Sequence, residues 1–288
     1  MAAPDTDAIT AVVVSHDSEQ ALPECLRSLR DAGLTAIVVD NASQDGTVAQ
    51  ARAAGATIIA NEENQGYGRA VNQALKAAAS EFCLILNPDV SFDSGAPGQL
   101  LALLRAQARA AAIAPKLIER DGRIFELSAS PINPPAAHAQ FDGAASRGLL
   151  SGAALLARRE RLLAIGGFDP NIFLFWDDND LCRRLVDAGD MLLLADAVFM
   201  KHSRGASSTV APGSIYARRW HQAWSRFYVF KKFGVASDAD RWVSTYTRKA
   251  MLAGLFGASR RVERYRGSLD GALAFHSGET ALAHQGLA

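Results

Sequence analysis

The chain has 288 residues, of which 49% are hydrophobic and 21% charged, with 30 basic and 30 acidic side chains. This composition is ordinary for one large globular domain, with or without a smaller appendage, and excludes a disordered, collagenous or coiled-coil chain. Its apolar runs are far shorter than the roughly 20 residues that span a bilayer, and we expect no secretory signal. The three scattered cysteines favour a reducing compartment over a disulfide framework.

The neutral total hides an uneven distribution of charge. Residues 1–200 carry 16 basic and 25 acidic side chains, whereas residues 201–288 carry 14 basic and 5 acidic ones. An acidic body could hold a metal ion, and a basic tail could contact phosphates or an anionic membrane surface. The simpler interpretation is a solvated basic helical surface that packs on an acidic domain.

The first third of the chain alternates between strand and helix patterns. A helix between Ser18 and Gly33 has its apolar side chains at helical spacing, with Ser18 as its expected cap and Gly33 as its end. Such alternation predicts a mostly parallel sheet with helices on both faces, and therefore an α/β fold. The strands are expected at residues 9–15, 36–40, 57–60 and 82–86, and further helices at 47–54 and 67–79.

The rest of the chain is less regular. Three prolines and little periodicity predict a flexible loop over residues 128–145. The remaining patterns predict helices at residues 100–111, 159–165, 178–188 and 216–233, a strand or buried segment at 149–157, and a strand within 191–200.

Polar side chains stand where the predicted parallel strands end. Ser15 and His16 end the first strand, Asp40 ends the second, and Asn87 and Asp89 follow the fourth. Ligands of open α/β sheets bind at the carboxyl ends of the strands, so these residues are expected to converge on one edge.

Two of these acids have both a functional and a structural interpretation. Asp40 could accept hydrogen bonds from a nucleobase or a ribose, or it could cap the next turn together with Ser43. Asp89 could bind Mg²⁺ or Mn²⁺ jointly with substrate phosphates, because hard cations prefer oxygen ligands. A Pro88–Asp89 pair also makes ordinary turns, which is the alternative.

Residues 64–72 open a helix through Gly66 and Gly68. Glycines allow close approach of a ligand to the backbone, and helix N-termini favour anions. The spacing matches neither the dinucleotide-binding fingerprint nor a Walker A motif. The alternative is that both glycines serve a tight turn.

Three acids at positions 177, 178 and 180 stand beside bulky apolar residues, and they cannot all face one direction. An acid in an apolar pocket has a raised pKa and can act as a general base. The alternative is a charged helix start with Trp176 in the core. His202 ends a later predicted strand, where a ligand could reach it.

In their order and spacing, these motifs resemble family 2 glycosyltransferases of the GT-A fold, especially rhamnosyl- and galactofuranosyltransferase-like members. The resemblance spans about residues 9–205, and the matching segments are VVVSHD, VVDNASQDGT, NQGYGRAVNQA, LILNPDV, SGAALLARR and GGFDPNIFLFWDDNDLCRRL, with a histidine after the next strand. It implies a mostly parallel central sheet with flanking helices. It also implies a catalytic domain over residues 1–210, with a nucleotide-sugar half at about 1–95 and an acceptor half at about 96–210, and a basic helical extension over 211–288.

The resemblance also implies a role for individual residues. By it, Ser15, His16, Asp40, Asn64, Gly66, Asn72 and Asn87 bind the donor nucleotide, Asp89 and His202 hold the metal, Asp178 is the catalytic base, and Trp176, Asp177 and Gly152 border the acceptor or the sugar. Four positions depart from the family pattern: His16 replaces an aromatic residue, Asp17 replaces an asparagine, Asn87 replaces the first acid of the DxD motif, and Asp177 replaces a glutamate.

The implied function is inverting, metal-dependent transfer of a hexosyl or rhamnosyl group in cell-surface polysaccharide synthesis. The donor would be a UDP- or dTDP-sugar with Mn²⁺ or Mg²⁺, and the acceptor a hydroxyl of a glycan or glycolipid. An alternative, motivated by Asp17 and Asn87, is a catalytically silent scaffold that binds nucleotide sugars. A nucleotidyltransferase and a dehydrogenase are disfavoured because their glycine-rich signatures are absent. No nucleic-acid partner is expected.

Residues 216–233 place Trp220, Trp224, Phe227 and Tyr228 on one helical face, with cations beside them. This pattern is typical of a helix that lies on an anionic membrane, which would make a cytoplasmic protein peripheral to the inner face of the cell membrane. The alternative is that the aromatic face packs on the catalytic domain or forms a homo-oligomer.

Overall fold

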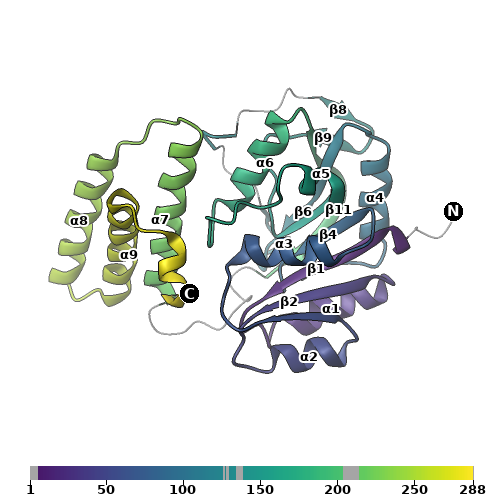
Figure 1. Cartoon of the computed structure of the whole chain (residues 1–288), viewed down its shortest axis with the longest axis horizontal. Coiled ribbons are helices and arrows are strands. Elements are labelled where there is room, and N and C mark those ends of the chain that lie inside the picture. Colours follow the sequence, from purple (N-terminus) through teal and green to yellow (C-terminus); the bar gives the residue numbers. More distant parts are fainter. Residues whose placement is uncertain (1–5, 126, 128–129, 134–138, 204–213, 288) are drawn as a thin grey trace. The chain divides into compact units, whose positions relative to one another are not determined.

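The computed structural model describes residues 6–125, 127, 130–133, 139–203 and 214–287. The chain forms two compact units (Figure 1). The first comprises Met1–Glu63, Arg69–Phe168 and Asp178–Thr209. The second comprises Asn64–Gly68, Asp169–Asp177 and Val210–Ala288, so it includes two short segments from the middle of the sequence.

The first unit is built on one mixed sheet with the strand order β3-β2-β1-β4-β10-β6-β11-β9-β8. The strands β3, β2, β1 and β4 are parallel, and β10 pairs antiparallel with both β4 and β6. β11 runs parallel to β6. The strands are β1 (Ile9–Ser15), β2 (Thr35–Asn41), β3 (Thr57–Asn61), β4 (Phe82–Leu86), β5 (Val90–Ser91), β6 (Ala110–Ile118), β7 (Ile124–Phe125), β8 (Gln140–Phe141), β9 (Ala144–Ser146), β10 (Ala154–Arg158) and β11 (Met191–His202).

Helices cover both faces of this sheet, because the central strands are apolar on both sides (Figure 1). On one face Val13 and Leu84 form a core with Cys25 of α1 and Leu104 of α4. α3 lies over the opposite face (Figure 1). The helices are α1 (Leu22–Asp31), α2 (Thr47–Ala53), α3 (Tyr67–Ala77), α4 (Ala96–Arg105), α5 (Arg159–Ala164) and α6 (Asp177–Asp187), and a short 3₁₀ helix, η1 (Thr6–Ala8), precedes β1.

The prediction of a helix over residues 100–111 is wrong at its end. α4 stops at Arg105, and Ala110 and Ala111 begin β6. The alanines of β6 are fully buried beside β10 and β11, so packing in the sheet overrides their helical propensity.

Three further local predictions need correction. Ser18 does not cap α1 with its side chain, which instead exchanges hydrogen bonds with the backbone of His16. The predicted loop 128–145 contains β8 and the start of β9, although residues 128, 129 and 134–138 lie outside the described residues. Within the predicted buried segment 149–157, the strand begins only at Ala154.

The second unit consists mainly of α7 (Ser214–Lys232), α8 (Ala239–Leu255), α9 (Ser259–Ser277) and the 3₁₀ segment η2 (Ala281–Leu287). α9 packs closely on α7 at Gly267 and Gly271. A Cβ at Gly271 would lie 2.2 Å from the Trp220 carbonyl oxygen, so neither glycine tolerates a side chain without movement of α7.

The aromatic face of α7 is buried within this unit. Trp220, Trp224 and Phe227 are at most 4% exposed, and Trp224 packs edge-on against Phe275 of α9. The expectation that this face lies on a membrane is therefore wrong, because the face packs against α9 within the second unit. In the described part of the chain, every helix is too short or too polar to traverse a bilayer.

Candidate functional site

The carboxyl ends of β2, β1 and β4 lie side by side, as the sequence predicts, because these strands are parallel neighbours. Ser15 is in register with Asp40, and its Oγ donates a hydrogen bond of 3.1 Å to Asp40 Oδ1. The backbone N–H of Ser43 donates to Asp40 Oδ2 at 2.9 Å. Asp40 thus caps the next turn together with Ser43, as the structural interpretation predicts. This buried carboxylate fixes the turn that follows β2.

His16 and Asp17 continue this edge beyond β1. His16 Nδ1 lies 2.7 Å from the Asn41 carbonyl oxygen, and because a carbonyl can only accept, Nδ1 carries the proton of this hydrogen bond. Asp17 has a φ of 47° and accepts from the Gln44 N–H at 2.7 Å. Asp17, which departs from the family pattern, therefore stabilises the loop after β2.

Asp89 and His202 are brought together from distant parts of the sequence. Val90 pairs with His202 in the β5–β11 ladder, so Asp89 Oδ1 lies 3.3 Å from His202 Nε2. Among the described residues, both carboxylate oxygens of Asp89 and Nδ1 of His202 are buried without a hydrogen-bond partner. Buried polar atoms are rarely left in this state, so the pair is poised for a ligand.

These two residues fit a divalent cation that shares its coordination with a bound molecule. No group of three or more His, Cys, Asp or Glu side chains with metal-binding geometry occurs in the described ranges. Mg²⁺-type sites often combine one or two carboxylates with substrate phosphates. Burial, followed by the negative charge of Asp89, raises the pKa of the nearby Cys25 thiol to about 12, so Cys25 stays neutral.

Asn87 and Gly152 connect this edge to the start of α6. The Asn87 N–H donates to the Ala153 carbonyl at 2.9 Å, and the Gly152 N–H donates to Asp178 Oδ2 at 3.5 Å. The Asn179 N–H holds the other oxygen of Asp178 at 2.8 Å. Burial raises the pKa of Asp178, although these two amides act in the opposite direction. The first unit therefore brings the candidate base Asp178 close to the sheet edge that ends in Asn87.

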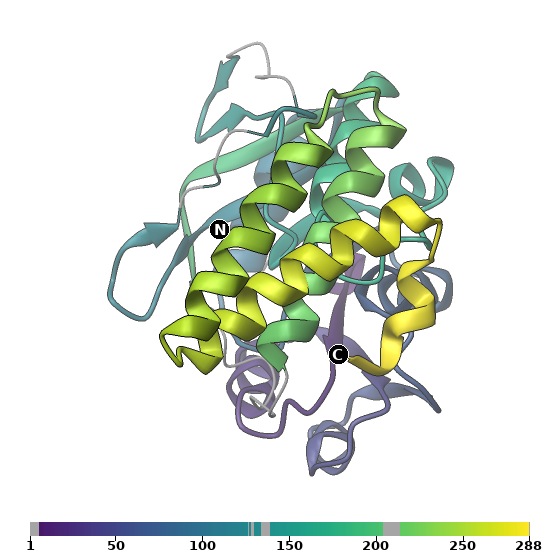
Figure 2. The same cartoon turned by 90° about the vertical axis from the view of Figure 1, so that its left-hand side faces the viewer.

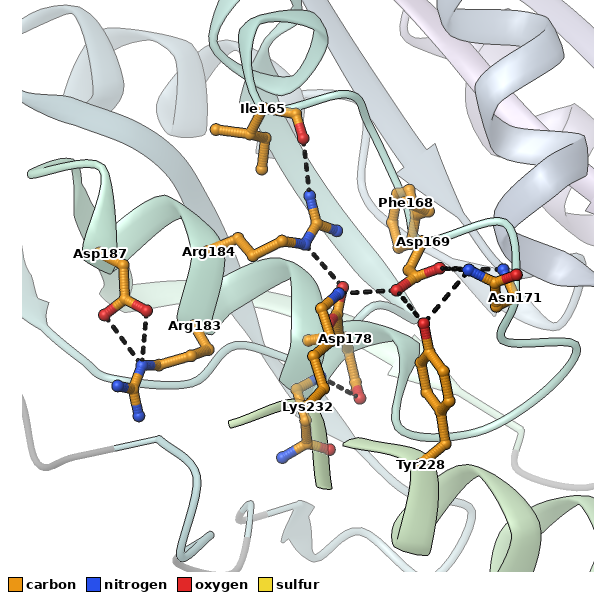
Figure 3. A network of polar contacts seen from close by, with 12 residues as sticks. Ile165, Phe168, Asp169, Asn171, Asp178, Arg183, Arg184, Asp187, Tyr228 and Lys232 are labelled. Atoms are coloured by element: carbon orange, nitrogen blue, oxygen red, sulfur yellow. Dashed lines mark hydrogen bonds and ion pairs between the residues drawn. The ribbon is translucent and has the colours of Figure 1, made fainter. Parts of the chain in front are cut away.

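The neighbouring acid Asp180 has a different environment. It is fully buried and forms a 2.7 Å ion pair with Arg184. Arg184 also donates to the Ile165 carbonyl (Figure 3). The prediction that the acids of this segment point in different directions is confirmed for Asp178 and Asp180. Asp177 is the first residue of α6.

Asn133 takes part in this arrangement and was not predicted. Its amide exchanges hydrogen bonds of 3.0 Å with Asn179, and Arg183 donates to the Ile132 carbonyl at 2.7 Å. A polar residue within a proline-rich loop carries no local signal for such a contact. The flanking prolines, which restrict the backbone, are the one feature that could have indicated it.

Asn72 lies on α3, and its side chain is bound to the backbone of Phe168. Its amide nitrogen donates to the Phe168 carbonyl, and its oxygen accepts from the Phe168 N–H, both at 2.8 Å. Gly167 has a φ of 71°, and a Cβ there would lie 2.2 Å from Asn72 Oδ1. The contacts of Asn72 thus fix the turn that precedes residues 169–177.

Asn64 and Gly66 belong to the second unit. Asn64 Oδ1 accepts from the Gly66 N–H at 3.0 Å, and the Tyr67 N–H donates to the Phe173 carbonyl at 3.0 Å. Gly66 has a φ of 82°, and a Cβ there would lie 2.6 Å from that carbonyl oxygen. The glycine is required by this close approach of two backbone segments.

Trp176 follows a strained stretch of the same unit. Phe175 and Trp176 have φ values of 67° and 64°, which aromatic side chains rarely adopt. Ser225 of α7 donates to the Leu174 carbonyl at 2.9 Å, and Trp176 packs edge-on against Phe230. Such strain persists where the surroundings enforce it and is common at functional sites.

Asp169 ties this stretch to α7, and no role of its own was predicted for it from the sequence. Its carboxylate accepts from Lys232 at 2.6 Å, from the Tyr228 hydroxyl at 3.0 Å and from the Asn171 N–H at 2.9 Å (Figure 3). Burial alone would raise the pKa of Asp169, but the hydrogen bonds from Lys232 and Asn171 lower it below its usual value.

The predicted residues are therefore divided between the two units. Asn64, Gly66, Trp176 and Asp177 belong to the second unit. The first unit brings together, at one sheet edge, Ser15, His16, Asp40, Asn87, Asp89, Gly152, Asp178 and His202.

Comparison with known proteins places the chain in context. The family profile described as "Glycosyl transferase family 2" matches residues 10–159. The chain is 27% identical over 246 residues to the N-acetylglucosaminyl-diphospho-decaprenol L-rhamnosyltransferase of Mycobacterium tuberculosis (strain ATCC 25618 / H37Rv), covering 73% of this chain and 80% of the relative.

Two solved structures share the fold. The mannosyltransferase PcManGT from Pyrobaculum calidifontis, in complex with GDP-Man and Mn²⁺, matches with a TM-score of 0.58 and 19% identity over 94% of this chain and 74% of that one. S. aureus TarS 1–349 in complex with UDP matches with a TM-score of 0.52 and 14% identity over 94% and 92%. These neighbours are GT-A glycosyltransferases, so the predicted GT-A fold is confirmed.

Proposed function

Because the chain belongs to glycosyl transferase family 2, we propose that it transfers a sugar from a nucleoside diphosphate sugar to a hydroxyl group, with inversion at the anomeric carbon. The observation that carries the proposal is the buried Asp89–His202 pair, whose unpartnered atoms lie at the same sheet edge as Asp40 and Asp178. Residues 1–95 would form the nucleotide-sugar half and residues 96–210 the acceptor half.

The donor would bind along the ends of β1 and β2. Asp40 and Ser15 would recognise the ribose or the base, and His16 offers a ring for stacking whose orientation the Asn41 carbonyl fixes. Asn64, Gly66 and Asn72 would also bind the nucleotide. We propose a UDP- or dTDP-sugar; the two structural neighbours were solved with GDP-Man and UDP.

Asp89 and His202 would hold Mn²⁺ or Mg²⁺, with Asn87 beside them. When bound there, the cation would stabilise the negative charge that develops on the leaving diphosphate. Asp89 is suited to this task because its carboxylate is buried without a hydrogen-bond partner within the described structure.

Asp178 would remove the proton from the acceptor hydroxyl as that oxygen attacks the anomeric carbon. Its raised pKa makes it a better proton acceptor than an ordinary aspartate, and the amides of Gly152 and Asn179 fix its orientation. A single displacement inverts the configuration at the anomeric carbon, and it requires only one carboxylate to accept the proton. Trp176, Asp177 and Gly152 would border the sugar or the acceptor.

The acceptor class is suggested by the mycobacterial relative, whose name describes rhamnosyl transfer to a diphospho-decaprenol-linked sugar. We propose a glycan or glycolipid acceptor and a hexosyl or rhamnosyl donor, in cell-surface polysaccharide synthesis at the cytoplasmic side of the membrane. The name of the relative, rather than the geometry of the site, supports this choice.

A thermal-shift screen of UDP- and dTDP-sugars with and without Mn²⁺, followed by a transfer assay, tests the proposal. A ligand that binds the native state raises Tm by mass action, so the donor should raise Tm more in the presence of the metal. Binding without transfer or hydrolysis would instead favour a catalytically silent scaffold. No shift with any nucleotide sugar would contradict both.

A further inference from the structure

The turn between α8 and α9 exposes four large apolar side chains. Met251 is 67% exposed, Leu252 49%, Leu255 80% and Phe256 83%. Figure 2 shows this turn at one end of the hairpin that α8 and α9 form. The other exposed large apolar side chains in the described structure are Ile124, Leu127, Phe199 and Leu273, which group at most in twos, whereas these four follow one another within six positions. A concentrated exposed patch of this kind marks a surface for interaction. We call the segment from Arg248 to Arg261 the α8–α9 tip.

Contacts other than the four exposed side chains of the tip hold the two helices together. Trp242 donates from its indole to the Ser268 carbonyl at 3.0 Å, and its ring packs against Tyr246. Ala253 is buried on the inner side of α8. The apolar side chains of the tip therefore add little to folding, and another constraint explains their exposure.

Cations surround this apolar patch. Residues 247–266 contain six basic side chains and one acidic side chain, a net charge of +5. Arg248, Lys249, Arg260 and Arg261 are all exposed. Among the described residues, Arg248, Arg260 and Arg261 form no ion pair within the protein, so their charge is available to a partner.

The apolar surface continues from the tip between the helices. A groove of about 430 Å³ between α8 and α9 is lined by Ala250, Met251, Gly254, Val262 and Leu269 together with polar residues at its rim. Met251 belongs to both the tip and the groove. The exposed turn carries apolar side chains with cations on either side. A lipid bilayer offers matching partners, since apolar acyl chains lie beneath anionic headgroups.

We propose that the α8–α9 tip docks the protein on an anionic bilayer. Leu255 and Phe256 enter the boundary between headgroups and acyl chains, and Arg248, Lys249, Arg260 and Arg261 bind the phosphates of the headgroups. Amphipathic elements bind membranes by this combination of apolar burial and attraction to anionic lipid. The surface differs from the aromatic face of α7, which is buried. Docking is also independent of which sugar is transferred.

Co-sedimentation of the full chain with vesicles tests the proposal. We expect binding to vesicles that contain phosphatidylglycerol, weaker binding at high salt, and little binding to pure phosphatidylcholine. The double variants L255E/F256E and R260E/R261E alter exposed side chains, so both should keep the Tm of the natural protein. Each cation near an anionic surface contributes a factor of about 5, so R260E/R261E should lower the partition coefficient at least about 25-fold.

Two matched controls separate the tip from general surface effects. L273E changes a 46% exposed leucine further along α9, and R241E reverses an exposed cation at the opposite end of α8. Both controls should bind vesicles within about twofold of the natural protein.

Three results would overturn the proposal. The natural protein could fail to bind anionic vesicles at low salt, or the tip variants could bind as well as the controls. The tip could instead mediate self-association, in which case light scattering would detect a dimer that L255E/F256E disrupts, without any effect of lipid. Because vesicle binding is measured without a sugar donor, failure here leaves the proposed transfer reaction untouched.

Discussion

At the scale of single residues, Asp178 and Asp180 are close neighbours in sequence but have different environments. Asp180 forms an ion pair with Arg184, whereas the hydrogen bonds that hold the carboxylate of Asp178 in the described structure come from the backbone amides of Gly152 and Asn179. A buried carboxylate without a cation is costly to ionise and is therefore a better base. This contrast favours Asp178 over Asp180 as the base in the transfer reaction that we propose.

D178N should lower kcat by about 10²–10⁴-fold, because the amide cannot accept the proton of the acceptor hydroxyl. Donor affinity, measured by calorimetry, should stay within a few-fold. D187N is the matched control, because the exposed Asp187 lies on the same helix and forms an ion pair with the half-buried Arg183. Wild-type kcat in D178N would remove this residue from the mechanism.

The pH dependence of kcat should report the same carboxyl. Burial raises the pKa of Asp178 above the usual 3.8, and the base acts only when deprotonated. Activity should therefore rise with pH through this raised pKa, so that the acidic limb of the profile lies above pH 3.8. A rate that stays flat down to pH 4 in a protein that remains folded would argue against Asp178 as the base.

D89A should weaken binding of a nucleoside diphosphate at least about tenfold in Mn²⁺, and hardly at all in EDTA, because the carboxylate acts through the cation. Isothermal titration in both buffers measures the difference. Equal weakening in the two buffers would show that Asp89 serves only the β4–β5 turn.

At the scale of elements, the sequence predicted β1 and β4 to the residue because each is a short apolar run with clear ends. It failed at Ala110, where an alanine run has no period and burial decides between helix and strand. The same limit applies to the site. The sequence predicted that Ser15 and Asp40 meet, but it could not show that Asn72 is bound to the Phe168 backbone, a contact 96 positions apart.

G66A should lower the free energy of unfolding more than G55A does. Both glycines have positive φ, at 82° and 78°, so both substitutions carry the left-handed cost of about 1–2 kcal/mol. Gly55 has open space around it, whereas a Cβ at Gly66 meets the Phe173 carbonyl at 2.6 Å. Denaturant melts of the two variants make the comparison. Equal losses would mean that the segment relaxes away from Phe173.

At the scale of the whole molecule, the division into units is interleaved along the chain. Residues 64–68 and 169–177 join the helices of the second unit, whereas the sequence predicts one continuous boundary near residue 210. Composition reveals the change of charge near residue 200 but not contacts such as that between Asp169 and Lys232, which are 63 positions apart. Such long-range pairs have no local signal in a single sequence.

K232M should lower the free energy of unfolding by about 1.5–3 kcal/mol at neutral pH, because it removes a hydrogen bond from a cation to the buried Asp169. The pKa of Asp169 is lowered in the folded state, so this stabilisation is complete above the usual pKa of 3.8 and disappears as pH falls through the lowered value. K231M, which changes an exposed neighbour, is the control. A difference between the variants that persists unchanged at low pH would contradict this assignment.

The position of β4 in the sheet has a consequence for synthesis on the ribosome. β1 to β4 emerge first and can pair, but the strand that covers the other side of β4 is β10, which begins only at Ala154. Until then the nascent chain presents the apolar edge Phe82–Leu86 to its surroundings. Exposed apolar edges recruit other chains. Overproduction should therefore be limited by aggregation of half-made chains, and slower translation or more chaperone should raise the yield of folded protein.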